Sequence, residues 1–267
     1  MTIVLAGSTP NFTVSYDDAI IVAKGYKASG LAFAQAVLAN CQQDFATLSS
    51  LFGGIMPAAD SLPFQIYLVP GQGGAGHGGC LSTVITCFIS PNSDTVGIPS
   101  LVVAEEAEVF MATQGKGFDC GASNGEALSR VAPTVLYPAL RDRWSTGNKW
   151  LNSTRQDWVS TNYPTDTCFP SIGCGSLFLN YLAYQLIFSW PDIIAAAAPT
   201  LAGTAENLGV QAPFAGFATL LANHFPPGQP ANLPDDDPFP LAGPIIQWSP
   251  MQVSKVDPER ATAGAMP

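Results

Sequence analysis

Three carboxylates interrupt an otherwise apolar segment, residues 101–112, at Glu105, Glu106 and Glu108. On a helix, Glu105 and Glu108 project from neighbouring positions on one face, while Glu106 turns away from them. A carboxylate on a mostly buried helix is unfavourable unless it meets a cation, a hydrogen-bond donor or a metal. Glu126 follows on what is expected to be the next helix. The types and spacing of these residues predict a metal site or an acid–base site.

These two segments resemble the gluzincin branch of the zinc metallopeptidases. In that branch one helix carries His-Glu-x-x-His, and a second helix supplies a glutamate ligand. Glu105 stands at the position of the general base, whereas Ala104 and Glu108 stand where the two ligand histidines are found. Glu126 matches the glutamate ligand, and Arg130 stands where an aspartate is usual. The resemblance implies a zincin-like fold and hydrolysis of peptide bonds, in a form that lacks both helix histidines.

The carboxylates leave the type of site open. A set of oxygen ligands without histidine suits Ca²⁺, Mg²⁺ or Mn²⁺ better than Zn²⁺. Zinc held by Glu108, Glu126 and His77 is the alternative, so the expected cofactor is one divalent metal such as Zn, Ca or Mn. A metal-free site is also open, because two close carboxylates can share one proton and hydrolyse a glycosidic bond. In a purely structural interpretation, Glu108 or Glu126 pairs with an arginine between residues 130 and 143.

His77 is one of two histidines, and it lies in a glycine-rich stretch, residues 71–80. Glycines let the backbone approach a ligand closely, so His77 is a candidate ligand, acid–base group or transition-state donor. The alternative is a solvent-exposed loop histidine. Tyr137 and Tyr163 are the other candidate donors to a developing oxyanion. The glycine stretch lacks the Gly-Lys-Ser/Thr ending of a phosphate loop, which argues against nucleotide binding.

The segment 141–170 is polar, aromatic and irregular, which is typical of a binding or lid element. Its tryptophans, Trp144, Trp150 and Trp158, are candidate substrate-binding residues that would stack on sugar rings or apolar side chains. Ordinary anchoring of the loop by these side chains is the alternative. The following stretch, residues 171–176, does not match the Gly-x-Ser-x-Gly pattern of a serine nucleophile.

The composition and net charge of the chain indicate which kinds of molecule it can bind. The chain has 267 residues, 47% of them hydrophobic and only 11% charged, with a formal net charge of −10. Nucleic acid and anionic membranes are therefore unfavourable partners, and a peptide or glycan is the expected substrate or ligand. No apolar run has the length of a membrane span, and the first residues do not resemble a signal peptide.

Six cysteines leave the compartment open between an oxidising one and the cytoplasm. Cys80 with Cys87, and Cys168 with Cys174, are close enough in sequence to form short disulfide loops. For Cys174, a disulfide with Cys168 is favoured over catalysis by the thiol. The low lysine content and polar, uncharged surface lean weakly towards an oxidising, extracytoplasmic location.

Hydrophobic periodicity predicts the elements that position these residues. Strands are expected at residues 12–16, 62–70 and 81–90. Helices are expected at 28–53, from 98 onward, at 124–140 with an interruption near Pro133, at 175–190, and in short pieces up to 224. The expected division is an α/β part over residues 1–100, a helical part over 101–225 with the carboxylates, and a Pro-rich acidic tail over 226–267. Within that tail, only residues 245–248 are expected to be ordered.

The predicted fold is α+β and zincin-like, a small twisted sheet with the N-terminal helix above it and a helical lower half. The first function hypothesis is a divergent zincin-like hydrolase in which Glu105 activates water and Glu108 and Glu126 act as ligands or electrostatic groups. The second is an inactive zincin-like module that binds peptide or glycan. The third is a metal-independent carboxylate-pair glycosidase, which predicts a bell-shaped pH profile that a chelator does not change.

Overall fold

The computed structural model describes residues 2–241, which form an α+β fold with one mixed five-stranded sheet and several helices. The chain divides into two compact units. The sheet unit comprises Met1–Gln114 and Ala132–Leu140, and the helical unit comprises Gly115–Val131 and Arg141–Pro267. This division differs from the expected boundary at residue 100, because the helix that begins near it packs within the sheet unit.

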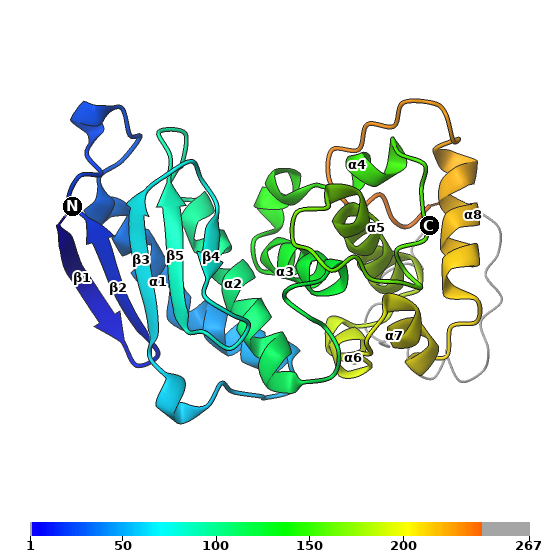
Figure 1. The fold of residues 1–267 in the computed structure, drawn as a ribbon, viewed down its shortest axis with the longest axis horizontal. Helices are drawn as coiled ribbons and strands as arrows, with labels where there is room; N and C mark the ends of the chain where they lie inside the picture. The colour runs from blue at the N-terminus through cyan, green and yellow to red at the C-terminus, as the bar shows by residue number, and fades with distance from the viewer. Residues whose placement is uncertain (1, 242–267) are drawn as a thin grey trace, which may run out of the picture. The chain divides into compact units, whose positions relative to one another are not determined.

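Five strands form the sheet of the first unit (Figure 1). They are β1 (Ile3–Thr9), β2 (Phe12–Asp17), β3 (Phe64–Pro70), β4 (Ala75–His77) and β5 (Val84–Ile89). Their spatial order is β1-β2-β3-β5-β4. The two central pairings, β2 with β3 and β3 with β5, are parallel, whereas the outer strands β1 and β4 run antiparallel to their neighbours. The strands predicted near residues 62–70 and 81–90 are confirmed.

Two helices, α1 (Gly30–Leu51) and α2 (Gly97–Gln114), cover one face of this sheet (Figure 1). Ser29 caps α1 by accepting a hydrogen bond from the Ala32 amide, and the helix ends before Gly53, whose φ of 74° suits glycine. The α1 prediction is therefore confirmed. Aromatic rings fill the space between helices and sheet, and they belong to Phe12, Phe45, Phe52, Phe64 and Phe110.

The short strand β4 was not predicted, since residues 71–80 were expected to be a flexible loop. β4 pairs with β5 through Ala75 opposite Cys87 and His77 opposite Ile85. A strand of three residues in a glycine-rich stretch has no period-two pattern, so only its pairing with β5 reveals it. The consequence is that His77 lies on an edge strand with a fixed register.

The helical unit contains most of α3 (Ser123–Leu136) and all of the later helices. These are α4 (Gly147–Leu151), α5 (Phe169–Asn180), α6 (Trp190–Ala195), α7 (Leu201–Asn207) and α8 (Pro213–His224). α3 runs through Pro133 and ends at Leu136. The helix predicted over 175–190 is wrong in its bounds, because α5 begins at Phe169 and passes at Tyr181 into a wider π turn.

Glycines of α5 permit unusually close packing inside the helical unit. A Cβ atom at Gly173 would collide with the carbonyl oxygen of Thr146, and one at Gly175 would lie 2.6 Å from the Cβ of Ala127. Residues 171–176 are therefore a helix-packing motif.

The segment after α8 is held by Asp236 rather than forming a loose acidic tail up to residue 241. The carboxylate of Asp236 accepts hydrogen bonds from the amides of Thr146 and Gly147 and from the hydroxyls of Ser145 and Thr146. These bonds satisfy backbone donors at the start of α4. The expected ordered stretch 245–248 lies outside the described residues.

The predicted short disulfide loops are wrong. Cys80 and Cys120 are disulfide-bonded, whereas Cys87, Cys168 and Cys174 are free thiols, as is Cys41. Cys87 lies in the core on β5, and six residues of helix separate Cys174 from Cys168 by more than a disulfide can span. Across residues 2–241, no helix combines the length and the apolar character needed to cross a membrane.

Candidate functional site

His77, Glu105 and Glu108 come together within the sheet unit. The Nε2 atom of His77 lies 3.0 Å from Oε2 of Glu108 and 3.7 Å from Oε2 of Glu105. The side chains are only 3%, 10% and 14% exposed for His77, Glu108 and Glu105, respectively. The predicted pair on α2 thus meets the candidate loop histidine in a largely dry environment.

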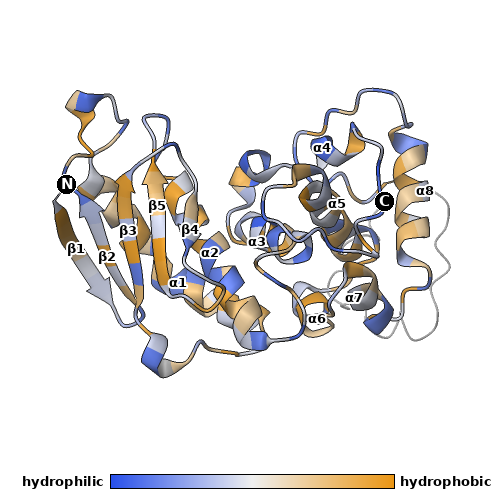
Figure 2. Cartoon of the chain, viewed as in Figure 1, coloured by the Kyte–Doolittle hydropathy of each residue, from blue (hydrophilic) through white to orange (hydrophobic). Residues whose placement is uncertain are grey.

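The elements explain this arrangement. Glu105 and Glu108 are three residues apart on α2, so both project towards the same neighbour. That neighbour is β4, against which α2 packs. Figure 2 shows the hydrophilic part of α2 beside β4, within a helix that is otherwise mostly hydrophobic. The antiparallel pairing of β4 with β5 fixes His77 at the end of the short strand.

The backbone fixes the tautomer of His77. Its Nδ1 atom lies 2.7 Å from the carbonyl oxygen of Gly79. A carbonyl oxygen only accepts hydrogen bonds, so Nδ1 carries the proton. In the neutral ring, Nε2 then presents a lone pair to two carboxylates, which is repulsive. Either a second proton on the ring or a cation between Nε2 and the carboxylates removes this repulsion.

The donor set fits a divalent cation. One nitrogen of His77 and one oxygen each of Glu105 and Glu108 all lie within 4.8 Å of one another. Ligand atoms about 2.1 Å from one metal lie roughly 3–4 Å apart, which matches the separations of 3.0 Å and 3.7 Å between Nε2 of His77 and the two carboxylates. Metal-binding histidines almost always donate their other ring N–H to a carbonyl or carboxylate, as Nδ1 of His77 does.

Charge also favours a cation in this position. The hydrogen bond to Glu108 raises the pKa of His77, and the charges of Glu108 and Glu105 raise it further, whereas burial lowers it. The same negative potential that holds a proton on the imidazole attracts a metal ion. Proton and metal therefore compete for Nε2.

Glu126, Tyr163 and Tyr137 were also predicted as catalytic or ligand residues. Glu126 and Tyr163 belong to the helical unit and are not members of the three-residue group. The hydroxyl of Tyr137 donates a hydrogen bond of 2.5 Å to Asp44 on α1. Its proton is thus engaged with a carboxylate of the core, which does not fit a role as oxyanion donor.

The three tryptophans do not form one binding surface. Trp150 is 1% exposed, stacks on Phe217 and donates its indole N–H to the carbonyl of Gln156. Trp150 is therefore a buried core residue, and the predicted role in substrate binding does not fit it. Trp158 supports Tyr163 in an edge-on contact, and Trp144 is half-buried.

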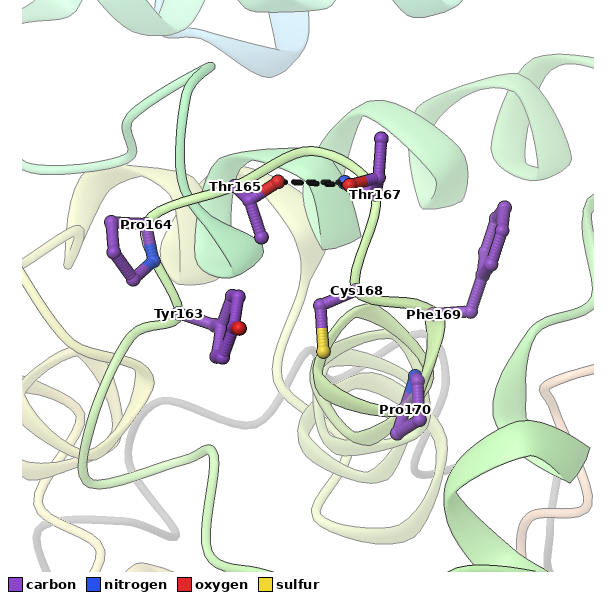
Figure 3. Close-up of a pocket in the computed structure, with 7 residues that line it drawn as sticks. All are labelled: Tyr163, Pro164, Thr165, Thr167, Cys168, Phe169 and Pro170. Carbon is purple, nitrogen blue, oxygen red and sulfur yellow. Dashed lines mark hydrogen bonds between the residues drawn. The ribbon is translucent and has the colours of Figure 1, made fainter.

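A hollow of about 670 Å³ lies in the helical unit, at the bend formed by residues 163–170 (Figure 3). The Tyr163 ring and the Cys168 thiol lie on the inner side of this bend, and the Phe169 ring stands on its outer side. Tyr163 and Phe169 are 39% and 44% exposed. The lining residues themselves are uncharged, and the guanidinium of Arg130 lies over the ring of Phe169, 5.5 Å from its centroid.

Packing and hydrogen bonds explain why asparagine and glycine precede Glu126 in the sequence. Asn124 donates hydrogen bonds to the carbonyls of Gly117 and Pro199. A Cβ atom at Gly125 would collide with the backbone of Asp119. Asn124 and Gly125 are thus accounted for by packing in the helical unit, without reference to catalysis.

Glu106, which turns away from His77, is fully buried, and neither of its carboxylate oxygens has a hydrogen-bond partner among the described residues. Burial raises its pKa well above the ordinary value, and the charge of Asp44 raises it further. An unsatisfied buried carboxyl group destabilises the folded state, so an apolar side chain of similar size is expected to be more favourable.

Glu106→Met should therefore raise the free energy of unfolding by about 1–3 kcal/mol in urea titrations, with the larger gain at higher pH, where ionisation of Glu106 is most unfavourable. The exposed Glu206 provides a control, since Glu206→Met should change stability by less than about 0.5 kcal/mol. A clear loss of stability in Glu106→Met would mean that Glu106 has a stabilising partner in solution.

Asp44 gives a pH-dependent prediction for the same unit. Burial raises its pKa from 3.8 to about 6, against the opposing hydrogen bond from Tyr137. The folded state therefore binds the proton more tightly than the unfolded state. The stabilising contribution of the protonated group is complete below about 3.8 and is lost as the pH rises through about 6.

Relative to Asp44→Asn, the wild-type protein is expected to lose up to about 3 kcal/mol of stability between about pH 4 and about pH 7. Urea unfolding followed by circular dichroism across this range measures the difference. Tyr137→Phe removes the hydrogen bond that lowers the pKa, so it should extend the loss to higher pH. A pH-independent difference between wild type and Asp44→Asn would contradict the prediction.

Comparisons of the chain with models of known protein families, with curated proteins and with solved structures find no match. Function must therefore be inferred from the geometry of the chain itself. Sequence reasoning identified all three side chains of the His77 group but not the carbonyl of Gly79, for which no sequence signal exists.

Proposed function

We propose that the protein is a divergent zincin-like hydrolase whose divalent cation is held by His77 and Glu108. The observation that carries this proposal is the hydrogen bond from Nδ1 of His77 to Gly79, which leaves Nε2 facing two carboxylates. His77 on β4 would thus replace the histidines that are absent from α2. The proposal uses residues of the sheet unit alone, and Glu126 belongs to the helical unit.

Glu105 is proposed as the general base. Its carboxylate lies beside the His77–Glu108 pair, at 3.7 Å from Nε2, and keeps some exposure to solvent. A carboxylate in this position can accept a proton from an attacking water molecule and return it to the leaving group. A bound divalent cation would supply a Lewis acid that polarises the substrate carbonyl.

An extended peptide is the proposed substrate. β4 is the outermost strand on its side of the sheet and pairs only with β5 within residues 2–241. An exposed strand edge can bind an extended peptide through backbone hydrogen bonds. Because β4 carries His77, a peptide that extends the sheet there would run beside Glu105 and Glu108.

Metal content tests this proposal. Protein purified without a His tag or chelator should contain about one equivalent of divalent metal by elemental analysis, and a chelator should lower its melting temperature. His77→Gln should abolish both effects. His224→Gln is the matched control, since His224 is the other histidine and is exposed at the end of α8. Wild-type protein without metal and without response to Zn²⁺, Mn²⁺ or Ca²⁺ would refute the proposal.

A binding module for peptide or glycan is the second candidate function, and the hollow at residues 163–170 favours it. Exposed aromatic rings and threonine hydroxyls suit a sugar ring or an apolar peptide segment. A substrate screen without turnover, together with a thermal shift by oligosaccharides that Tyr163→Ala removes, would select this function. Hydrolysis of glycosides that resists chelator would instead select the carboxylate-pair glycosidase.

A further inference from the structure

The hollow at residues 163–170 has a partly buried arginine beside it, Arg130 of α3. The guanidinium of Arg130 lies over the ring of Phe169, with Cζ 5.5 Å from the ring centroid. Phe169 is one of the residues that line the hollow, and both residues belong to the helical unit. A positive charge is therefore held against the wall of this hollow by an aromatic face.

The charge of Arg130 has no counterion among residues 2–241. Its Nε atom is buried without a hydrogen-bond partner there, and its guanidinium takes part in none of the ion pairs. Contact with an aromatic face does not use the N–H donors, because they lie in the plane of the guanidinium. A partly buried charge without a counterion is unfavourable, so binding of an anion is favoured. A carboxylate fits best, since it can accept two parallel N–H bonds from an arginine.

The helix that begins at the hollow adds a second positive potential. The cap residue of α5, Cys168, and its first residues, Phe169 and Pro170, all line the hollow. A helix N-terminus carries a partial positive charge, and the first turn of α5 contains no acidic residue that would offset it. Asp166 is the only carboxylate within residues 163–170, and it is exposed and outside the lining. Water and salt therefore screen its repulsion of an anion.

The other lining residues suit a sugar ring better than a peptide. Tyr163 offers an exposed aromatic face, which can cover the C–H groups of a sugar. The hydroxyls of Thr165 and Thr167 lie 3.0 Å apart on the same bend (Figure 3). Whichever of them donates to the other, the acceptor keeps its own proton for a ligand. Sugar hydroxyls provide acceptors for that proton, whereas apolar peptide side chains do not.

We propose that the hollow binds a sugar that carries a carboxylate, such as the uronate units of an acidic oligosaccharide, and that Arg130 recognises the carboxylate. This inference rests on the second candidate function, glycan binding at this hollow, and names its ligand class. It does not depend on a cation at His77. Arg130 also stands where the resemblance to gluzincins leads one to expect an aspartate, and a role in binding accounts for that departure.

Calorimetric titration of the full chain with matched trisaccharides tests the proposal. Trisaccharides of glucuronate and of galacturonate are compared with their neutral glucose and galactose counterparts, in the presence of a chelator so that no cation at His77 contributes. At least one uronate should bind about 10–100-fold more tightly than its neutral counterpart, as expected for hydrogen bonds between charged groups. Arg130→Gln should remove this preference and leave the affinity for the neutral sugar unchanged.

Three further variants separate recognition of the carboxylate from general effects on the fold or charge. Lys149→Gln removes the same charge from an exposed position of the helical unit and should leave the preference unchanged. Arg130→Lys keeps the charge but lacks the planar fork, so it should lose most of the preference while the protein stays folded. Tyr163→Ala should weaken binding of the acidic and the neutral sugar by the same factor.

The outcomes distinguish this inference from the functions proposed above. Equal affinity for uronate and neutral sugar, with both weakened by Tyr163→Ala, would overturn the role of Arg130 and leave glycan binding in place. A preference for uronate that survives Arg130→Gln would overturn it as well. If neither sugar binds, the inference fails, and binding of an apolar peptide would then assign the hollow to peptides. Uronate binding that depends on Arg130 in a protein without metal would support the inference and refute the metal-dependent hydrolase alone.

Discussion

Glu105→Gln is expected to abolish peptide hydrolysis and leave the bound cation in place. Glutamine keeps the size of the side chain but cannot accept a proton from water, so kcat should fall by about 10²–10⁴-fold. The substitution leaves the two proposed ligands, His77 and Glu108, unchanged; they lie 3.0 Å apart in the wild-type protein. The metal content and the response of the melting temperature to chelator should therefore persist. A broad peptide library supplies the substrate, and single-turnover measurements give the rate.

Two further variants distinguish a general base from a metal ligand and from an unrelated surface carboxylate. Glu206→Gln changes an exposed carboxylate in the helical unit and should retain full activity. Glu108→Gln should lose both activity and metal, because it removes a ligand rather than the base. A fully active Glu105→Gln protein would exclude Glu105 as the base. Loss of metal in Glu105→Gln would assign Glu105 to the ligand set instead.

The second large effect is expected for Asp236→Ala, which should destabilise the helical unit by about 3–5 kcal/mol. Asp236 is 8% exposed, and its carboxylate accepts four hydrogen bonds from residues 145–147. Alanine would leave the buried amides of Thr146 and Gly147 without an acceptor. Since these amides begin α4, which packs on α5, the loss should spread through the helical unit.

Tryptophan fluorescence during urea unfolding reports this effect selectively. The described tryptophans, Trp144, Trp150, Trp158 and Trp190, all belong to the helical unit. Asp166 is exposed, and Asp166→Ala should change the unfolding free energy by less than about 0.5 kcal/mol. A similarly small effect of Asp236→Ala would mean that residues 226–241 do not anchor α4 in solution.

The corrected expectations share a physical origin. The helix of residues 175–190 was misplaced because its segment is apolar on every side, as suits a buried helix, and periodicity then gives no boundary. Trp150 was assigned to a surface because its neighbours in sequence are polar, yet Phe217 buries it from another helix. The short disulfide loops failed because closeness in sequence does not bring sulfur atoms together when a strand or helix intervenes.

The sequence by itself determined the long amphipathic elements and the carboxylate pair. Period-two and helical patterns are local, so they predicted β3, β5 and α1, and the three-residue spacing placed Glu105 and Glu108 on one face of α2. His77 was recognisable as a candidate because the chain has only two histidines.

Only the tertiary structure decided which of these groups meet. The pairing of β4 with β5 brings His77 to Glu108 across 31 residues of sequence, and the Gly79 carbonyl selects the proton on Nδ1. The anchoring of α4 by Asp236 spans a still longer separation, of 89 to 91 residues. Such contacts are fixed by the packing of whole elements and by backbone atoms that every residue shares, so no local pattern of side chains records them.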